Sequence, residues 1–160
     1  IVLGSTWGLV TAWLPLIIPS DDYFALNVDE HGWLLIVARS FMVIALCVPF
    51  DVKDIAFDRA TMAYPTLPVR FGVKVSNFIA IWFSIMGLAA SIVWVQVDGW
   101  GNIMLAAMVA STLINCVLLF LVREDSPEWY YTLVLDGLML LHAAMIIGAL
   151  YLEISIALAQ

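Results

Sequence analysis

Charged residues are scarce in this 160-residue chain, at 12% of the sequence, while 64% of the residues are hydrophobic. A soluble domain of this length needs far more charged surface. Only six residues are Lys or Arg, so the chain has no basic patch for nucleic acid and we expect no nucleic-acid partner. The scarcity of charge predicts an integral membrane protein whose surroundings are the lipid bilayer.

Cysteine is also rare in this sequence. The two cysteines, Cys47 and Cys116, both fall inside apolar stretches. No Cys-x-x-Cys pair is present, which argues against a zinc or redox site of that type. We expect two free thiols that pack as small hydrophobic side chains.

Five apolar runs are long enough to cross a bilayer, which needs about 20 residues. They cover residues 1–20, 33–50, 75–97, 99–122 and 129–152, and we expect the last run to continue past Glu153. The only charged residues or histidines within them are Arg39, Asp136 and His142. The runs predict an all-α fold, an integral membrane bundle of five transmembrane helices that forms one domain.

The remaining basic residues fix an orientation for these five helices. All of them fall in loops that alternate to one side of the membrane, and the loop 21–31 on the other side has four acids and no basic residue. The positive-inside rule places the basic side in the cytoplasm. We expect a bacterial inner-membrane protein whose cytoplasmic side carries Lys53, Arg59, Arg70, Lys74 and Arg123.

Three aspartates, Asp51, Asp54 and Asp58, directly follow the second apolar run. If helical geometry continues, they fall within an arc of roughly 60° on one face. Carboxylates gathered on one face repel one another unless a cation is present, and such oxygen ligands suit Mg²⁺. The spacing therefore indicates a candidate Mg²⁺ site flanked by Arg59, which is placed to contact a bound phosphate. The alternative is a solvated turn whose charges merely end the helix.

The segment 51–72 resembles the second aspartate-rich motif of the UbiA superfamily of intramembrane prenyltransferases. Residues 131–141 are also similar to the last helix of some members. The family's first motif, of the form Asn-x-x-x-Asp-x-x-x-Asp, is absent from this chain, which starts at Ile1. We therefore expect residues 1–160 to be the C-terminal part of a single UbiA-like domain, with an N-terminal half missing. The matching residues read Asp51-x-x-Asp54-x-x-x-Asp58-Arg59, then Thr66-Leu67-Pro68-Val69 and Gly72.

The resemblance implies Mg²⁺-dependent transfer of a prenyl group from an isoprenyl diphosphate to a lipophilic, often aromatic, acceptor. The metal neutralises charge that builds on the leaving diphosphate. The resemblance implies Asp51, Asp54 and Asp58 as Mg²⁺ ligands and Arg59 as a diphosphate contact, with Arg70 and Lys74 as weaker candidates that steer the anion.

The sequence also departs from the family pattern. Tyr64 and Pro65 stand where members often carry Gly and a basic residue, and Arg70 stands where an apolar residue is more usual. Two alternatives therefore stay open. One is a non-catalytic or degenerate membrane protein, and the other is a cation transporter, which would place its carboxylates nearer the middle of the bilayer.

The charged residues within the apolar runs need partners, because an unpaired charge in the bilayer is costly. Arg39 lies roughly 18 Å along its helix from Asp51, and Asp136 lies roughly 10 Å into the last helix. We expect either an Arg39–Asp136 pair, or one of the two lining a substrate cavity, or snorkelling to the lipid surface. His142 is expected to hydrogen-bond to a neighbouring helix rather than to act as a general base. Glycines within the runs, such as Gly87 and Gly137, are expected to permit close helix approach.

Overall fold

A computed structural model describes residues 32–61 and 65–159 of the chain, and every regular element in these ranges is a helix. Four helices in these ranges are long and apolar enough to cross a membrane: Trp33–Lys53, Val73–Val97, Asn102–Leu121 and Tyr130–Leu158. They confirm that the described residues are all-helical and have the character of an integral membrane protein. The fifth predicted span, residues 1–20, lies outside the described residues.

The helix bounds follow the apolar runs closely, apart from the last predicted helix, which begins in π geometry. Its α-helical part extends past Glu153, as expected. In chain order the elements are α2 (Gly32–Lys53), α3 (Ile55–Thr61), α4 (Leu67–Phe71), α5 (Val73–Val97), α6 (Asn102–Leu121), the π-helix η1 (Tyr130–Leu135) and α7 (Asp136–Leu158).

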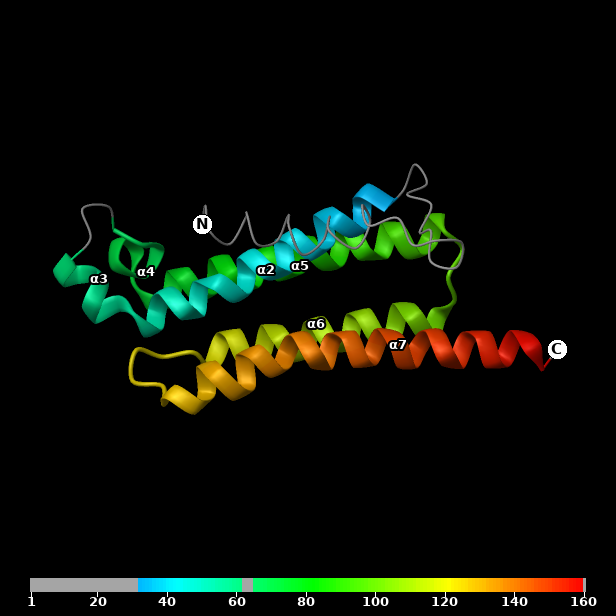
Figure 1. Cartoon of the computed structure of the whole chain (residues 1–160). Helices are drawn as coiled ribbons and strands as arrows, with labels where there is room; N and C mark the ends of the chain where they lie inside the picture. The colour runs from blue at the N-terminus through cyan, green and yellow to red at the C-terminus, as the bar shows by residue number, and fades with distance from the viewer. Residues whose placement is uncertain (1–31, 62–64, 160) are drawn as a thin grey trace, which may run out of the picture.

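The long helices pack in sequence, α2 on α5, α5 on α6 and α6 on α7, and α2 also touches η1 (Figure 1). The helices α3 and α4, the start of α5, the end of α6 and the loop 122–129 therefore lie at one end of the bundle, which we call the Asp-rich end. The start of α2, the turn between α5 and α6 and the end of α7 lie at the opposite end.

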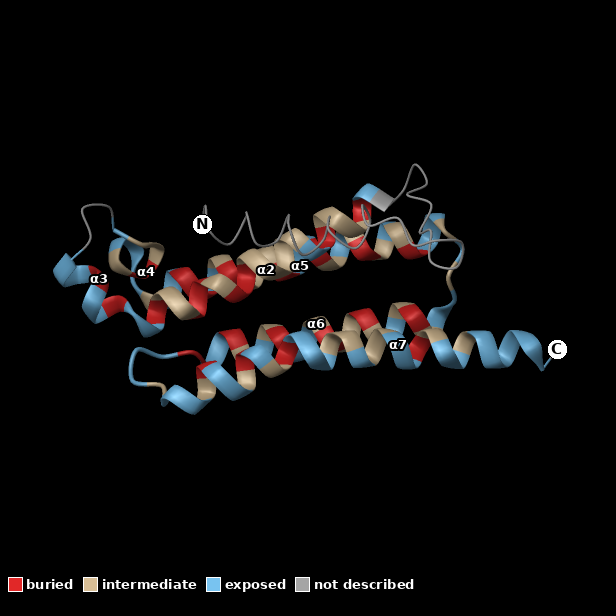
Figure 2. Ribbon diagram, viewed as in Figure 1, coloured by how far each residue is buried: buried red, intermediate tan, exposed pale blue. Residues whose placement is uncertain are grey.

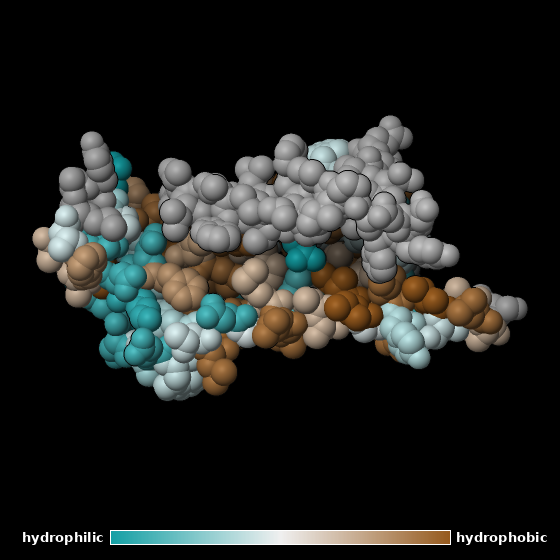
Figure 3. Space-filling view, in the orientation of Figure 1, coloured by the Kyte–Doolittle hydropathy of each residue, from teal (hydrophilic) through white to brown (hydrophobic). Residues whose placement is uncertain are grey.

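Buried side chains form a strip along the facing sides of the helices (Figure 2). At the Asp-rich end, Leu46 and Val52 of α2 pack with Tyr131, Leu135 and Leu138, which holds α2 against η1 and α7. The outward faces are apolar and exposed, as expected for helices that meet lipid. In Figure 3 hydrophilic residues gather at the Asp-rich end, while much of the remaining described surface in view is hydrophobic.

Gly87 allows α2 and α5 to approach closely, as predicted. A Cβ atom at this position would lie 3.0 Å from the Ala38 carbonyl oxygen of α2. A Cβ at Gly137 or Gly148 would meet nothing within 4 Å, so these two glycines do not serve that purpose among the described residues. Cys47 and Cys116 are free and partly buried, in agreement with the sequence.

Side-chain hydrogen bonds tie α6 to its neighbours. The Glu153 carboxylate on α7 accepts hydrogen bonds from the backbone amides of Gly101, at 3.1 Å, and Met104, at 2.8 Å. These amides lie at the N-terminus of α6, where the first backbone donors have no partner within the helix. On the other side, Asn115 Nδ2 donates to Ser84 Oγ of α5 at 3.1 Å. A carboxylate thus caps α6 at the opposite end of the bundle.

Candidate functional site

The aspartate segment, residues 51–59, runs from the last turn of α2 into α3. α2 stops at Lys53, Asp54 lies in a turn, and α3 starts at Ile55. The backbone nevertheless keeps helical spacing, because Asp54 N donates to Phe50 O at 3.1 Å and Asp58 N donates to Asp54 O at 2.9 Å. The helical spacing on which the predicted common face of the three aspartates depends is therefore present.

The three carboxylates have different surroundings. Asp51 is half-buried and lies within electrostatic range of both Asp58 and Asp54. Asp54 is exposed. Asp58 is only 4% exposed, and its Oδ2 accepts a hydrogen bond from Thr66 Oγ1 at 3.0 Å. Neither Asp51 nor Asp54 forms an ion pair or a side-chain hydrogen bond within the part of the chain that the structure describes.

This arrangement bears on whether the chain could hold Mg²⁺. Within residues 32–61 and 65–159, no group of three or more His, Cys, Asp or Glu side chains is arranged to hold a metal ion. Mg²⁺, however, usually takes one or two carboxylates and completes its shell with water and substrate phosphate. Asp51 and Asp54 repel each other and form no ion pair with a cation among the described residues, so they fit that open donor set. Their assignment as ligands, with Asp58, stays a prediction.

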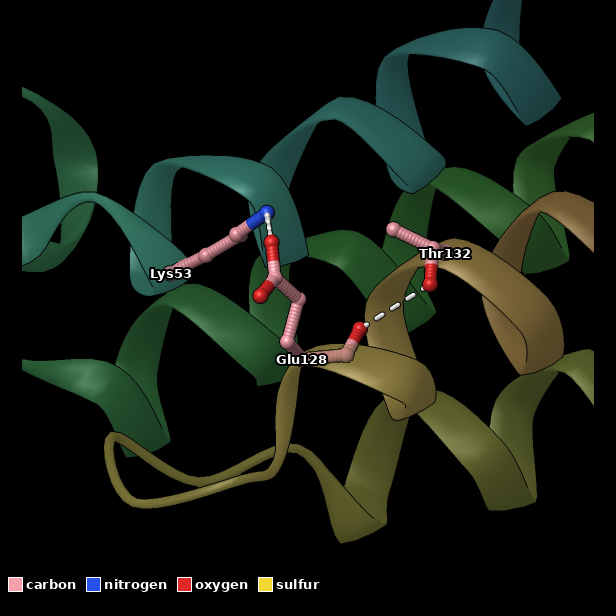
Figure 4. A network of polar contacts seen from close by, with 3 residues as sticks. All are labelled: Lys53, Glu128 and Thr132. Atoms are coloured by element: carbon pink, nitrogen blue, oxygen red, sulfur yellow. Dashed lines mark hydrogen bonds and ion pairs between the residues drawn. The ribbon is translucent and has the colours of Figure 1, made fainter.

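Two ion pairs connect the aspartate segment to the loop before η1. Lys53 Nζ lies 3.2 Å from Glu128 Oε1, and Glu128 in turn accepts a hydrogen bond from Thr132 at its backbone carbonyl (Figure 4). Arg59 Nη1 lies 3.2 Å from Glu124 Oε1, with both side chains about half exposed. Arg59 is therefore engaged by a carboxylate through one nitrogen, and it can contact a diphosphate by exchanging Glu124 or through its remaining N–H groups.

The other two predicted diphosphate contacts lie on α4 and α5. Arg70 places its guanidinium 5.2 Å from the centre of the Phe71 ring, a cation–π geometry. Lys74 is exposed in the first turn of α5. Among the described residues, neither forms an ion pair with the three aspartates. The structure therefore does not gather the predicted cations around one point.

Arg39 and Asp136 are not brought together, since no ion pair joins them in the described part of the chain. Asp136 is exposed in the first turn of α7. Arg39 instead lines a cavity of about 30 Å³ between α2, α5, α6 and α7. This cavity is too small for a substrate, so the alternative in which one of the two residues lines a substrate cavity stays a prediction.

His142 lines the same central cavity and bonds to a neighbouring helix, as predicted. Its Nδ1 lies 2.8 Å from Ser111 Oγ of α6, and that hydroxyl also lies 3.0 Å from the Met108 carbonyl. A hydroxyl has one proton, so if Ser111 donates to Met108, His142 Nδ1 must carry a proton and donate to Ser111. The cavity volume is enough for one ordered water, and the aspartates do not line it.

Sequence reasoning missed the partners of the charged residues. Glu124 and Glu128 were not considered, although their loop lies on the same predicted side of the membrane as Lys53 and Arg59. That shared side was the feature of the sequence from which these ion pairs could have been predicted. The Thr66–Asp58 hydrogen bond had no signal beyond the resemblance, because eight residues separate the two.

Comparisons with known proteins identify no family for this chain. No family model matches it, and neither does any curated protein or solved structure.

Proposed function

We propose that the chain supplies the second aspartate-rich motif of a UbiA-like membrane prenyltransferase. Such an enzyme moves a prenyl group from an isoprenyl diphosphate to a lipophilic acceptor. The observation that supports this most is the aspartate segment itself. Asp51 and Asp54 keep helical spacing at the end of a membrane-length helix, repel each other, and have no internal cation in the described residues.

The geometry suggests a division of roles within the segment. Asp51 and Asp54 would hold Mg²⁺, which when bound neutralises charge on the departing diphosphate. Asp58 is held by Thr66 and fixes α3 against α4. Arg59 would release Glu124 and bind a diphosphate oxygen by a charge-assisted hydrogen bond. The apolar helices would exclude water from the reacting carbon.

The proposal includes a second acidic motif outside this chain, since the family's first motif is absent here. It also places the Asp-rich end on the cytoplasmic side, because the basic residues outside the apolar runs gather on that side. The position of the aspartates at the end of α2, away from the middle of the helix, favours an enzyme over a cation transporter, whose ion sites lie near the midplane.

The test is Mg²⁺-dependent pyrophosphate release from a panel of labelled isoprenyl diphosphates, with the protein in detergent or lipid. In a protein that carries both acidic motifs, we expect Mg²⁺-dependent release and a loss of roughly 100-fold or more in Asp54→Asn, because a ligand of the Mg²⁺ that neutralises the leaving diphosphate is lost. Asp125→Asn is the matched control, since it removes the same charge from the same end. Release that does not depend on Mg²⁺, or equal rates in Asp54→Asn and the control, would contradict the enzyme assignment and favour the non-catalytic alternative.

A further inference from the structure

A groove of about 700 Å³ lies at the Asp-rich end, between the start of α5 and the end of α6. Its apolar wall includes Phe78, Ile81 and Phe120, and Phe78 and Phe120 are 68% and 74% exposed. An ordered water occupies about 30 Å³, so the groove suits a much larger molecule with an apolar part.

Two cations line the polar end of this groove, Lys74 and Arg123. α5 and α6 are antiparallel neighbours, so the first turn of α5 and the residues after α6 meet at one end. Ile81 lies roughly 10 Å further along α5 than Lys74. The groove is therefore amphiphilic, with positive charge at the membrane surface and aromatic and aliphatic side chains below it.

The positive charge of the groove is not cancelled by its one acid. Glu124 also lines the groove, but Arg59 holds its carboxylate at 3.2 Å. Neither Lys74 nor Arg123 has an ion-pair partner in the part of the chain that the structure describes. The backbone of Arg123 is also fixed, because its N–H donates to Ser126 Oγ at 2.9 Å and its carbonyl accepts from Tyr131 at 2.8 Å.

A buried polar atom in the wall supplies a second observation. Asn77 lines the groove and is 6% exposed. Its Nδ2 donates to the Val122 carbonyl at 2.8 Å, and its Oδ1 is buried with no hydrogen-bond partner. Such an oxygen is costly unless a donor reaches it.

We propose that this groove binds an anionic phospholipid from the adjacent leaflet. The phosphate lies between Lys74 and Arg123, and an acyl chain runs along Phe78, Ile81 and Phe120. Basic pockets between transmembrane helices bind acidic lipid headgroups in this way. The proposal uses none of the three aspartates. It does use Lys74, which the sequence predicted as a weaker diphosphate contact, so competition with an isoprenyl diphosphate separates the two ligands.

Native mass spectrometry of the full chain in a neutral detergent tests the site, with phosphatidylglycerol and phosphatidylcholine offered at equal concentration. We expect phosphatidylglycerol to be retained preferentially. Lys74→Gln and Arg123→Gln should each weaken its binding about fivefold, from the contribution of one cation near a lipid surface. Lys53→Gln removes a cation that lies at the same end of the bundle but outside the groove, so it should not change the binding of phosphatidylglycerol. Equal retention of the two lipids, or the same loss in Lys53→Gln, would overturn the proposal.

Two competitors distinguish a phospholipid from other anions. Inorganic phosphate should not displace phosphatidylglycerol, because it makes no contact with the apolar wall. Displacement by inorganic phosphate would mean that the groove is a simple anion site. Displacement by a short isoprenyl diphosphate at equal concentration would assign the groove to the donor substrate. Either result would overturn the proposal. The assay contains no Mg²⁺ and measures no turnover, so its failure and that of the prenyltransferase assignment can be told apart.

Discussion

Carboxylates have different surroundings at the two ends of the bundle. At the end away from the aspartates, Glu153 accepts hydrogen bonds from two backbone amides at the start of α6. At the Asp-rich end, Asp51 and Asp54 have no such donors in the described residues and lie close enough to repel each other. A carboxylate that is satisfied by helix amides serves the fold, whereas carboxylates held together without a donor or cation are available to a ligand.

The largest contrast is expected between activity and stability at Asp51. Asp51→Asn should lower prenyl-transfer turnover roughly 100- to 1,000-fold, the range seen when one preorganised electrostatic group is removed. Its thermal unfolding temperature in detergent should not fall, because neutralising Asp51 relieves repulsion with Asp54 and Asp58. A clear loss of stability with turnover intact would make Asp51 a structural residue like Glu153.

At Glu153 the pattern should be reversed. Glu153→Ala leaves Gly101 N and Met104 N without their acceptor and should lower the free energy of unfolding by about 1–2 kcal/mol, as for loss of a helix cap. Glu153→Gln keeps an acceptor oxygen and should lose less. Unfolding in detergent measures both variants, and turnover should be unchanged; unaltered stability in Glu153→Ala would remove the contrast between the two ends.

The third prediction concerns Asp58, which accepts a side-chain hydrogen bond from Thr66. Thr66→Val removes the hydroxyl that donates to Asp58 Oδ2 and should cost about 1 kcal/mol of unfolding free energy. Thr61→Val is the control, since Thr61 is exposed and, among the described residues, its hydroxyl bonds to the Phe57 carbonyl within the same helix. If the two variants lose the same stability, the Thr66–Asp58 hydrogen bond does not hold α3 to α4.

The smallest effects are expected at the two ion pairs of the Asp-rich end. A double-mutant cycle on Lys53 and Glu128, or on Arg59 and Glu124, should give a coupling energy of about 0.2–1 kcal/mol in unfolding measurements. The coupling should shrink as salt is added, because exposed pairs are screened. A larger, salt-independent value at Arg59–Glu124 would mean that Arg59 is not free to exchange its partner for a diphosphate.

Much of the fold could be predicted because lipid imposes simple rules on sequence. Uncharged runs of membrane length correspond to α5 and α6 almost residue for residue. The π-helix η1 was not predictable in this way. The Tyr130 hydroxyl donates to the Leu118 carbonyl and the Tyr131 hydroxyl donates to the Arg123 carbonyl. These contacts depend on the path of the loop 122–129, which brings η1 back against the end of α6.

The polar contacts could be predicted from the sequence only in part. The depth of Arg39 and Asp136 along their helices was predictable, but an ion pair also needs the two helices to face each other, and depth does not fix rotation. His142 was easier, because a histidine inside a bundle usually needs a partner, and Ser111 supplies it. The spacing of the three aspartates was predictable from helical geometry, whereas the burial of Asp58 and its hydrogen bond from Thr66 depend on how α3 and α4 pack.

The central claim is that the aspartate segment holds a divalent ion, and Mn²⁺ binding tests it most directly. Mn²⁺ is an oxygen-seeking substitute for Mg²⁺ with an electron paramagnetic resonance signal. With a short isoprenyl diphosphate present, we predict a protein-bound Mn²⁺ signal that is lost in the Asp51→Asn/Asp54→Asn variant and kept in Glu153→Gln. Equal Mn²⁺ binding by the parent chain and the double variant would contradict the claim.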